Sequence, residues 1–254
     1  RLAAMSVWQA SCSNAVVSMA FAREHTIAGF HIHVCEGAYD RDHCSATYHE
    51  TVVHRLARHG ILGEQTICGH CVYLTDEDRR MLAETGTAVV HNPQSNMGNA
   101  VGVTDILKLI GAGVTVGLGT DGFTSDILES VKTANVLVKH MNQHPSIGFG
   151  EVMDMAFVNN AKLADRHFGD TCGVIRPGAR ADLIVSDYRP MTRLGPDNIN
   201  GHITFGMNGH NVTTTICGGR VLMQDRELVG IDEEKIQHEC RAQADALWKS
   251  LGAH

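Results

Sequence analysis

Short runs of apolar and β-branched residues alternate with segments of helical periodicity over the first two thirds of the chain. Four of these runs have the length of strands and cover residues 30–34, 66–70, 87–91 and 115–119. Between them, Thr75 begins a capping-box-like helix start that Gly86 ends, and a further helix is predicted from Ser125 to about His140. Strands that alternate with helices predict a parallel sheet and an α/β fold.

An earlier unit of the same kind is predicted at the beginning of the sequence. Residues 6–11 have the pattern of a strand end, and residues 15–24 have the pattern of the helix after it. With the four runs above they make about five successive βα units. Five or six strands fit part of a (β/α)8 barrel or an open doubly wound sheet, so the pattern leaves both architectures open.

The character of the sequence changes after about residue 172. Residues 212–223 have the pattern of a hairpin with Gly218 and Gly219 at its turn, which indicates a small β subdomain. The last segment has apolar residues at helical spacing and is expected to pack on the rest of the chain as an amphipathic helix. The predicted parts are therefore 1–171, 172–230 and 231–254.

Composition narrows the classes of function. The 254 residues are 43% hydrophobic and 19% charged, and 21 Lys and Arg against 28 Asp and Glu give a net charge of −7. No long cationic run is present, so nucleic acid is not an expected partner. No apolar stretch reaches the roughly 20 residues of a membrane span, and the first residues do not read as a signal peptide. The eight cysteines lack the spacing of a secreted disulfide scaffold, so we expect a cytoplasmic protein.

Sixteen histidines are many for this length, and some of them follow predicted strands. His33 with Glu36, His70, and Asp121 follow three different runs, whose carboxyl ends share one face in a parallel barrel. Imidazole and carboxylate together suit zinc, iron or manganese, and such an ion lowers the pKa of a coordinated water towards about 7. The pattern therefore predicts a hydrolytic metal site. Each residue alone also has an ordinary explanation: a hydrogen-bonded core histidine, a loop carboxylate or a helix N-cap.

Several motifs, taken together and in order, resemble the amidohydrolase superfamily. They are residues 30–36 (Phe-His-Ile-His-Val-Cys-Glu), 69–71 (Gly-His-Cys), 91–96 (His-Asn-Pro-Gln-Ser-Asn), 117–122 (Gly-Leu-Gly-Thr-Asp-Gly) and 177–182 (Pro-Gly-Ala-Arg-Ala-Asp). The branch they resemble contains cytosine and guanine deaminases and chlorohydrolases. Residues 90–102 and 205–209 are more similar still to aminohydrolases linked to selenium metabolism.

This resemblance implies a fold and a set of roles. The chain would supply about strands 4–8 of a (β/α)8 barrel plus a small β subdomain. His33 and Asp121 would bind one divalent ion, expected to be zinc, with iron or manganese as alternatives. Glu36 would shuttle protons and, with Asp121 and His70, form the catalytic set.

The resemblance also implies a reaction. Metal-activated water would hydrolyse a non-peptide C–N bond, deaminating a small amino-substituted heterocycle. His91 and Asn96 would line the substrate pocket.

Two features depart from the family pattern. Its members carry a His-x-His pair on strand one, in a segment that precedes this sequence, so the N-terminal part of the barrel is expected to be missing. The alternative, that His31 and His33 are this pair, conflicts with the helical segment before them and with Glu36 after them. Gln9 stands where relatives usually place a substrate-contacting histidine, and glutamine cannot titrate.

Two other functions compete with this interpretation. Cys68 and Cys71 form a C-x-x-C that would suit a thiol-disulfide oxidoreductase, although that motif belongs at a helix start and here follows a predicted strand. A partial chain that lacks two metal ligands would instead be catalytically incompetent. The open edges of a partial barrel also favour association into a homo-oligomer.

Overall fold

A parallel sheet runs through the first part of the chain. The computed structural model describes residues 3–4 and 29–252, and within them the strands of this sheet follow one another in sequence order. They are β1 (Ala3–Ala4), β2 (Phe30–Val34), β3 (Ile67–His70), β4 (Ala88–His91) and β5 (Val116–Leu118). Their order has no reversal point, unlike the order of a doubly wound sheet. The expected α/β fold is confirmed, whereas the strand end at 6–11 and the helix at 15–24 lie outside the described residues.

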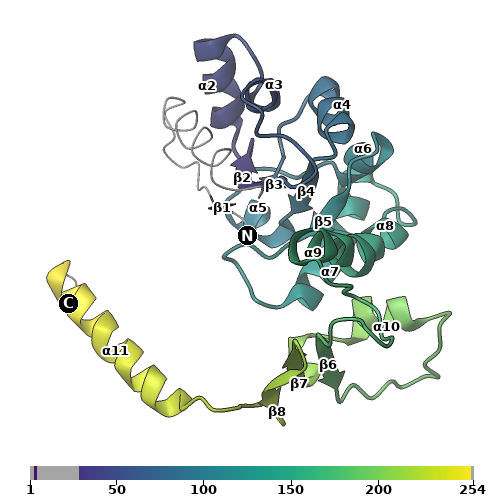
Figure 1. Ribbon diagram of the computed structural model, residues 1–254, viewed down its shortest axis with the longest axis vertical. Coiled ribbons are helices and arrows are strands. Elements are labelled where there is room, and N and C mark those ends of the chain that lie inside the picture. The colour runs from purple at the N-terminus through teal and green to yellow at the C-terminus, as the bar shows by residue number, and fades with distance from the viewer. Residues whose placement is uncertain (1–2, 5–28, 253–254) are drawn as a thin grey trace. The chain divides into compact units, whose positions relative to one another are not determined.

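Helices connect the strands and cover the sheet (Figure 1). They are α2 (Ala38–Tyr48), α3 (Val52–Arg58), α4 (Asp76–Glu84), α5 (Pro93–Gly98), α6 (Ile106–Gly111), α7 (Ile127–Asn142), α8 (Phe149–Met153), a π-helical segment η1 (Asp154–Asn159) and α9 (Asn160–Phe168). The predicted helices at Thr75 and Ser125 correspond to α4 and α7.

Local sequence explains where these helices begin. Thr75 Oγ1 accepts a hydrogen bond from the Asp78 backbone N–H at 3.1 Å, and the Asp78 carboxylate accepts one from the Thr75 N–H at 2.9 Å. This reciprocal pair is the predicted capping box. At α7 the N-cap is Asp126, whose carboxylate accepts from the Leu128 N–H at 2.9 Å. Asp121 therefore does not cap this helix, and its carboxylate is available for another role.

The core lies between the sheet and these helices. Val34, Cys68, Val89 and Val116 are fully buried on consecutive strands, and Leu82 of α4 packs in the same cluster. Burial of such side chains contributes roughly 1.5–3 kcal/mol each to stability, before the entropy of ordering them is subtracted. The strand ends are therefore held on a rigid, packed base.

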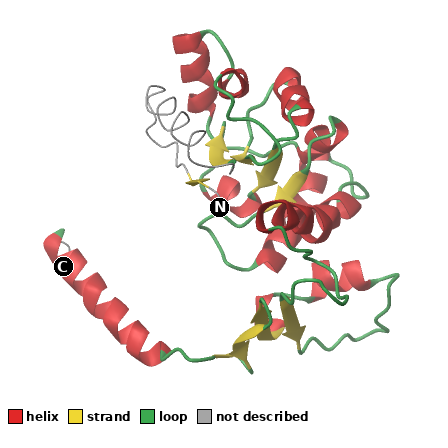
Figure 2. Cartoon of the chain, viewed as in Figure 1, coloured by secondary structure: helices red, strands yellow, loops and turns green. Residues whose placement is uncertain are grey.

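A second sheet is antiparallel and belongs to a separate unit (Figure 2). Its strands are β6 (Leu183–Ser186), β7 (Val212–Cys217), β8 (Arg220–Gln224) and β9 (Glu227–Leu228). Gly218 and Gly219, with φ of 55° and 77°, form the tight turn between β7 and β8, as predicted. The two units comprise Arg1–Ala179 with Pro190–Gly209, and Arg180–Arg189 with His210–His254.

The remaining helices lie in the C-terminal part of the chain. α10 (Ile199–Gly206) and the short η2 (Gly209–Asn211) precede β7, and α11 (Glu233–Ser250) forms the predicted C-terminal helix. None of the α11 side chains is buried, so its packing on the rest of the chain stays a prediction, as do the predicted domain limits. Among the described residues, no helix has the length and apolar character needed to cross a bilayer.

Candidate functional site

Two neighbouring strands bring His33 and His70 to one edge of the sheet. In the β2–β3 register His33 lies beside Gly69, and Val34 lies beside His70. A Cβ at Gly69 would stand 3.5 Å from the His33 ring, an ordinary van der Waals contact, so Gly69 lies directly against that ring. The two imidazoles meet edge to face with their centroids 4.8 Å apart.

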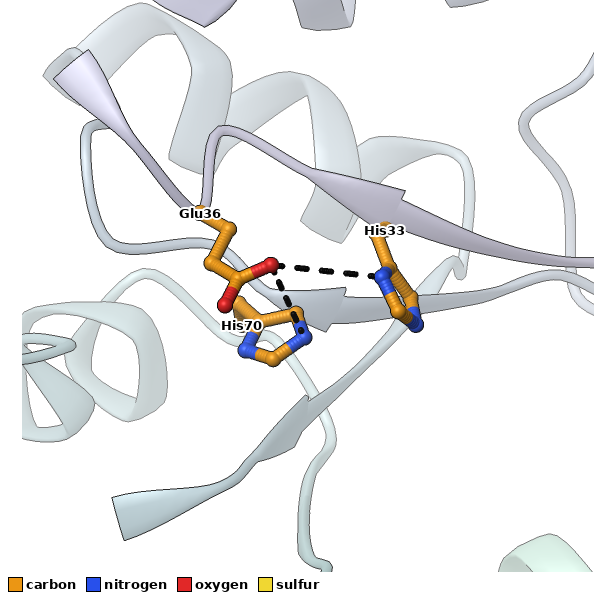
Figure 3. Close-up of side chains that lie close together, drawn as sticks. All are labelled: His33, Glu36 and His70. Atoms are coloured by element: carbon orange, nitrogen blue, oxygen red, sulfur yellow. Dashed lines mark ion pairs between the residues drawn. The ribbon is translucent and has the colours of Figure 1, made fainter. Parts of the chain in front are cut away.

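The Glu36 carboxylate lies against both imidazoles (Figure 3). Its Oε2 atom is 3.6 Å from His70 Nε2 and 4.0 Å from His33 Nδ1. Its Oε1 atom accepts a hydrogen bond from Asn99 Nδ2 at 3.2 Å. Asn99 thus holds one oxygen and leaves the other facing the histidines. The Glu36 side chain is 17% exposed, so this carboxylate is accessible to a ligand.

Asp121 joins the cluster from the loop after β5. Its Oδ2 atom is 3.6 Å from His70 Nε2 and accepts a hydrogen bond from Ser95 Oγ at 2.7 Å, while Oδ1 accepts from the Gly122 N–H at 2.6 Å. Partial burial raises the pKa of Asp121, but these hydrogen bonds and the nearby His70 and His33 lower it by more. The pKa lies below its ordinary value, so Asp121 is ionised at neutral pH.

The backbone at the strand ends is unusual. His70 and Asp121 have φ of 68° and 52°, and Cys35 and Cys71 beside the cluster have φ of 49° and 54°. Residues other than glycine adopt this left-handed backbone conformation at a cost of order 1 kcal/mol or more, and such residues gather at functional sites. The conformation turns the chain sharply after each strand and directs the His70 and Asp121 side chains towards one point.

The donor atoms suit a divalent cation. His33 Nδ1 and His70 Nε2 are buried, and neither finds a hydrogen-bond partner within the part of the chain that the structure describes. Together with a Glu36 oxygen they lie within 4.8 Å of one another. Two orphaned imidazole nitrogens beside ionisable carboxylates match the ligand preference of zinc, iron and manganese. His31 is not part of this group, although it shares the strand with His33.

The other residues predicted for the site are placed differently. His91 is 2% exposed, and its pKa is lowered to about 3 by burial and by the neighbouring His70. Asn96 is completely buried and bonds to His70 Nδ1 through Oδ1 at 2.7 Å. Contact of either residue with substrate stays a prediction, and Gln9 lies outside the described residues.

Sequence reasoning assigned no role to three residues that hold this cluster. Ser95 binds Asp121, Asn99 binds Glu36, and Thr104 donates a hydrogen bond from Oγ1 to the His70 carbonyl oxygen at 2.7 Å. Ser95 and Asn99 belong to the motif over residues 90–102, whose family resemblance indicates no role for either residue. Thr104 carries no motif signal, because its role depends on a loop that folds back over β3.

The C-x-x-C segment is not placed for thiol exchange. Cys68 lies on β3 and Cys71 just after it, and both thiols are buried. Burial, then a hydrogen bond with Cys68, raises the pKa of the Cys71 thiol well above its ordinary value. A thiol that stays protonated is a poor nucleophile, so the oxidoreductase alternative does not fit this geometry.

A labelling experiment checks the state of these thiols. Alkylation of the native protein by iodoacetamide is expected to leave Cys68 and Cys71 unmodified, because both are buried and Cys71 is protonated. Peptide mapping by mass spectrometry reports the modified positions, and both cysteines should react after unfolding in urea. Fast labelling of Cys71 in the folded protein would contradict the assignment.

Known proteins are similar to this chain over most of its length. The profile of the amidohydrolase family matches residues 1–222. The 5′-deoxyadenosine deaminase of Methanosarcina mazei is 36% identical over 225 residues, which are 87% of this chain and 51% of that protein. The 5-methylthioadenosine/S-adenosylhomocysteine deaminase of Thermococcus onnurineus is 39% identical over 202 residues, 78% of this chain and 47% of that protein.

A solved structure supports the fold. The crystal structure of an adenosine deaminase from Xanthomonas campestris with bound zinc superposes with a TM-score of 0.83 at 24% identity, covering 98% of this chain and 57% of that chain. The chain thus spans about half the length of the curated relatives it matches.

Proposed function

The chain belongs to the amidohydrolase family, and from this membership and the geometry of its site we propose that the complete protein hydrolytically deaminates a small heterocycle. One observation carries the proposal. Three strand ends, those of β2, β3 and β5, deliver His33 with Glu36, His70 and Asp121 to one cluster. Within the described residues, His33 Nδ1 and His70 Nε2 are buried without a hydrogen-bond partner, so both nitrogens are available to a ligand in this cluster.

We propose further that the parallel strands are about strands 4–8 of a (β/α)8 barrel. The unbroken order β1-β2-β3-β4-β5 supports this, because successive strands are neighbours in such a barrel. The clustering of ionisable side chains at the carboxyl ends of the strands supports it too, since active sites of these barrels lie on that face. The rest of the barrel would come from a part of the complete protein that this sequence does not contain.

The residues that would hold the metal are His33 and Asp121, with one divalent cation expected to be zinc. His33 supplies the orphaned Nδ1 atom, and Asp121 supplies an ionised carboxylate. The family resemblance adds a His-x-His pair from the first strand of the barrel. When bound, the cation supplies Lewis-acid activation of the attacking water.

The side chains of this chain would then divide the proton transfers between them. Asp121, ionised and held by Ser95, is placed to accept a proton from the water. His70 Nε2 faces the same position and orients the water and the substrate. Glu36, held by Asn99, carries protons to the ring and then to the departing ammonia. The barrier is lowered because these groups are positioned before the substrate arrives.

The relatives indicate the class of substrate. Two of them are named for deamination of adenosine derivatives, 5′-deoxyadenosine in one case and 5-methylthioadenosine or S-adenosylhomocysteine in the other. We propose a substrate of the same class, an adenine nucleoside altered at its 5′ position. The closer likeness to selenium-linked aminohydrolases, the cytoplasmic location and a homo-oligomeric state stay predictions.

A direct assay tests this function. The purified full-length protein, incubated with 5′-deoxyadenosine or 5′-methylthioadenosine, is expected to release ammonia and to convert the adenine ring to hypoxanthine. The loss of absorbance near the adenine maximum and an ammonia assay both report this change. Dialysis against a chelator should abolish the activity and added zinc should restore it. A metal-loaded protein that deaminates no adenine nucleoside, cytosine or guanine would refute the proposal.

A further inference from the structure

Behind His70, on the side away from the carboxylates, lies a buried chain of hydrogen bonds. His70 Nδ1 is 2.7 Å from Asn96 Oδ1, and Asn96 Nδ2 donates to Thr104 Oγ1 at 3.2 Å. Thr104 Oγ1 in turn donates to the His70 carbonyl oxygen at 2.7 Å. The three residues are 0%, 0% and 2% exposed, so bulk water does not compete for these atoms.

The hydroxyl proton of Thr104 determines the direction of every bond in this ring. A threonine hydroxyl has one proton, and here it is donated to the His70 carbonyl. Oγ1 can therefore act towards Asn96 only as an acceptor, so the amide must present its NH2 group to Thr104. Its carbonyl oxygen then faces His70, and an oxygen acceptor requires that Nδ1 carries a hydrogen.

The reverse arrangement leaves buried groups without partners. If the Asn96 amide were turned by 180°, its oxygen would face Thr104 and its NH2 would face His70. The Thr104 hydroxyl could then satisfy either the amide oxygen or the His70 carbonyl, but not both. A buried polar group left without a partner costs roughly 1–3 kcal/mol, which is enough to select one arrangement.

We propose that Thr104 and Asn96 are positioning residues that keep a hydrogen on Nδ1 of His70 and so leave Nε2 as the nitrogen that faces the site. This inference rests on the proposed function, because it gives that function the atom through which His70 acts. Nε2 is the nitrogen that stands 3.6 Å from Glu36 Oε2 and from Asp121 Oδ2. Nε2 is therefore the His70 nitrogen that the water and substrate in the site can reach.

The position of Asn96 also changes its predicted role. Both ends of its amide are engaged within the ring, and its side chain is completely buried. In this proposal Asn96 acts on the substrate through His70. Asn99 has a different partner, because its amide donates a hydrogen bond to the Glu36 carboxylate.

NMR spectroscopy of the full-length protein can identify which His70 nitrogen carries a hydrogen, and the measurement does not depend on catalytic activity. Protonated and unprotonated imidazole nitrogens have well-separated 15N resonances, so a long-range 1H–15N spectrum of histidine-labelled, metal-free protein identifies the nitrogen that carries the hydrogen. The His70 signals are assigned by their absence in His70→Gln. The expected spectrum has a protonated Nδ1, and an unprotonated Nδ1 in the wild type overturns the proposal whatever any variant does.

Substitution of Thr104 tests the cause. Thr104→Val keeps the shape but removes the hydroxyl, which frees the Asn96 amide to turn, so a second set of His70 signals with hydrogen on Nε2 should appear. Thr104→Ser keeps the hydroxyl and should restore the single tautomer. Thr66→Val is the matched control, because Thr66 is equally buried and donates to the Ile61 carbonyl at 2.6 Å at the other end of β3.

Kinetics separate this inference from the function itself. In the metal-loaded enzyme, Thr104→Val should lower kcat by about 10- to 100-fold, as loss of a residue that orients a site histidine typically does, with KM changed less. Thr104→Ser should recover kcat, and Thr66→Val should lower only thermal stability. Unchanged His70 signals in Thr104→Val would refute the proposed role of Thr104 and would leave the proposed deaminase function untouched. A protein that deaminates nothing but shows the expected spectra would refute only the proposed function.

Discussion

Replacing Glu36 by glutamine will lower kcat by about 10²- to 10⁴-fold and leave the bound metal in place. The substitution keeps the shape of the side chain, so the hydrogen bond from Asn99 to Oε1, 3.2 Å in the structure, can persist. What disappears is the capacity to accept and return a proton at the atom that faces His70 and His33. Steady-state kinetics and metal analysis by mass spectrometry measure the two quantities separately.

A second glutamate provides the control for this experiment. The exposed Glu77 of α4 pairs with His54 of α3 at 3.4 Å, and Glu77→Gln makes the same chemical change away from the site. It should leave both kcat and metal content unchanged. If Glu36→Gln retained full activity, proton transfer would have to be assigned to another group. If it lost the metal, Glu36 would be a ligand, which its place among the 4.8 Å donor group permits.

Removing either proposed ligand will abolish turnover through loss of the metal. His33→Ala or Asp121→Ala is expected to bring the metal content close to zero and to reduce kcat/KM by at least about a thousandfold. A metal contributes several kcal/mol to transition-state stabilisation, and each 1.4 kcal/mol is a factor of ten. Asp121→Ala also leaves the Ser95 hydroxyl without its 2.7 Å acceptor, so some loss of thermal stability should accompany it.

Matched variants separate ligand loss from general damage. His31→Ala removes an imidazole two positions away on the same strand that does not belong to the donor cluster. Asp105→Ala removes a carboxylate that caps α6 by accepting from the Lys108 N–H at 3.1 Å, which should cost about 1 kcal/mol of stability and no metal. Retained metal in both His33→Ala and Asp121→Ala would show that the ligand assignment is wrong.

The sequence predicted the elements well because their signals are local. The strand over Phe30–Val34 was predicted with the same limits that the structure shows, and the capping box at Thr75 begins α4 as expected. The turn at Gly218 and Gly219 followed from two adjacent residues able to adopt positive φ. These features depend on neighbours in the chain and need no knowledge of the tertiary fold.

The site was only partly predictable, for a physical reason. His33, Glu36, His70 and Asp121 could be grouped because parallel strands place their carboxyl ends on one face. The polar contacts around them depend on loops instead. Thr104 and Asn99 reach β3 and Glu36 across 34 and 63 residues of sequence. No periodicity encodes such contacts, so the ring that joins His70, Asn96 and Thr104 became visible only in three dimensions.

The left-handed backbone at His70 and Asp121 is a local cost that the surrounding contacts outweigh. Glycine adopts φ of 68° or 52° more readily than histidine or aspartate, by up to about 1 kcal/mol. At position 70 the substitution would lose more than it gains, because it would leave a cavity where the completely buried ring was and leave Asn96 Oδ1 without its partner. Screens for hardier variants of this family should hold positions 70 and 121 constant and seek their gains on the surface.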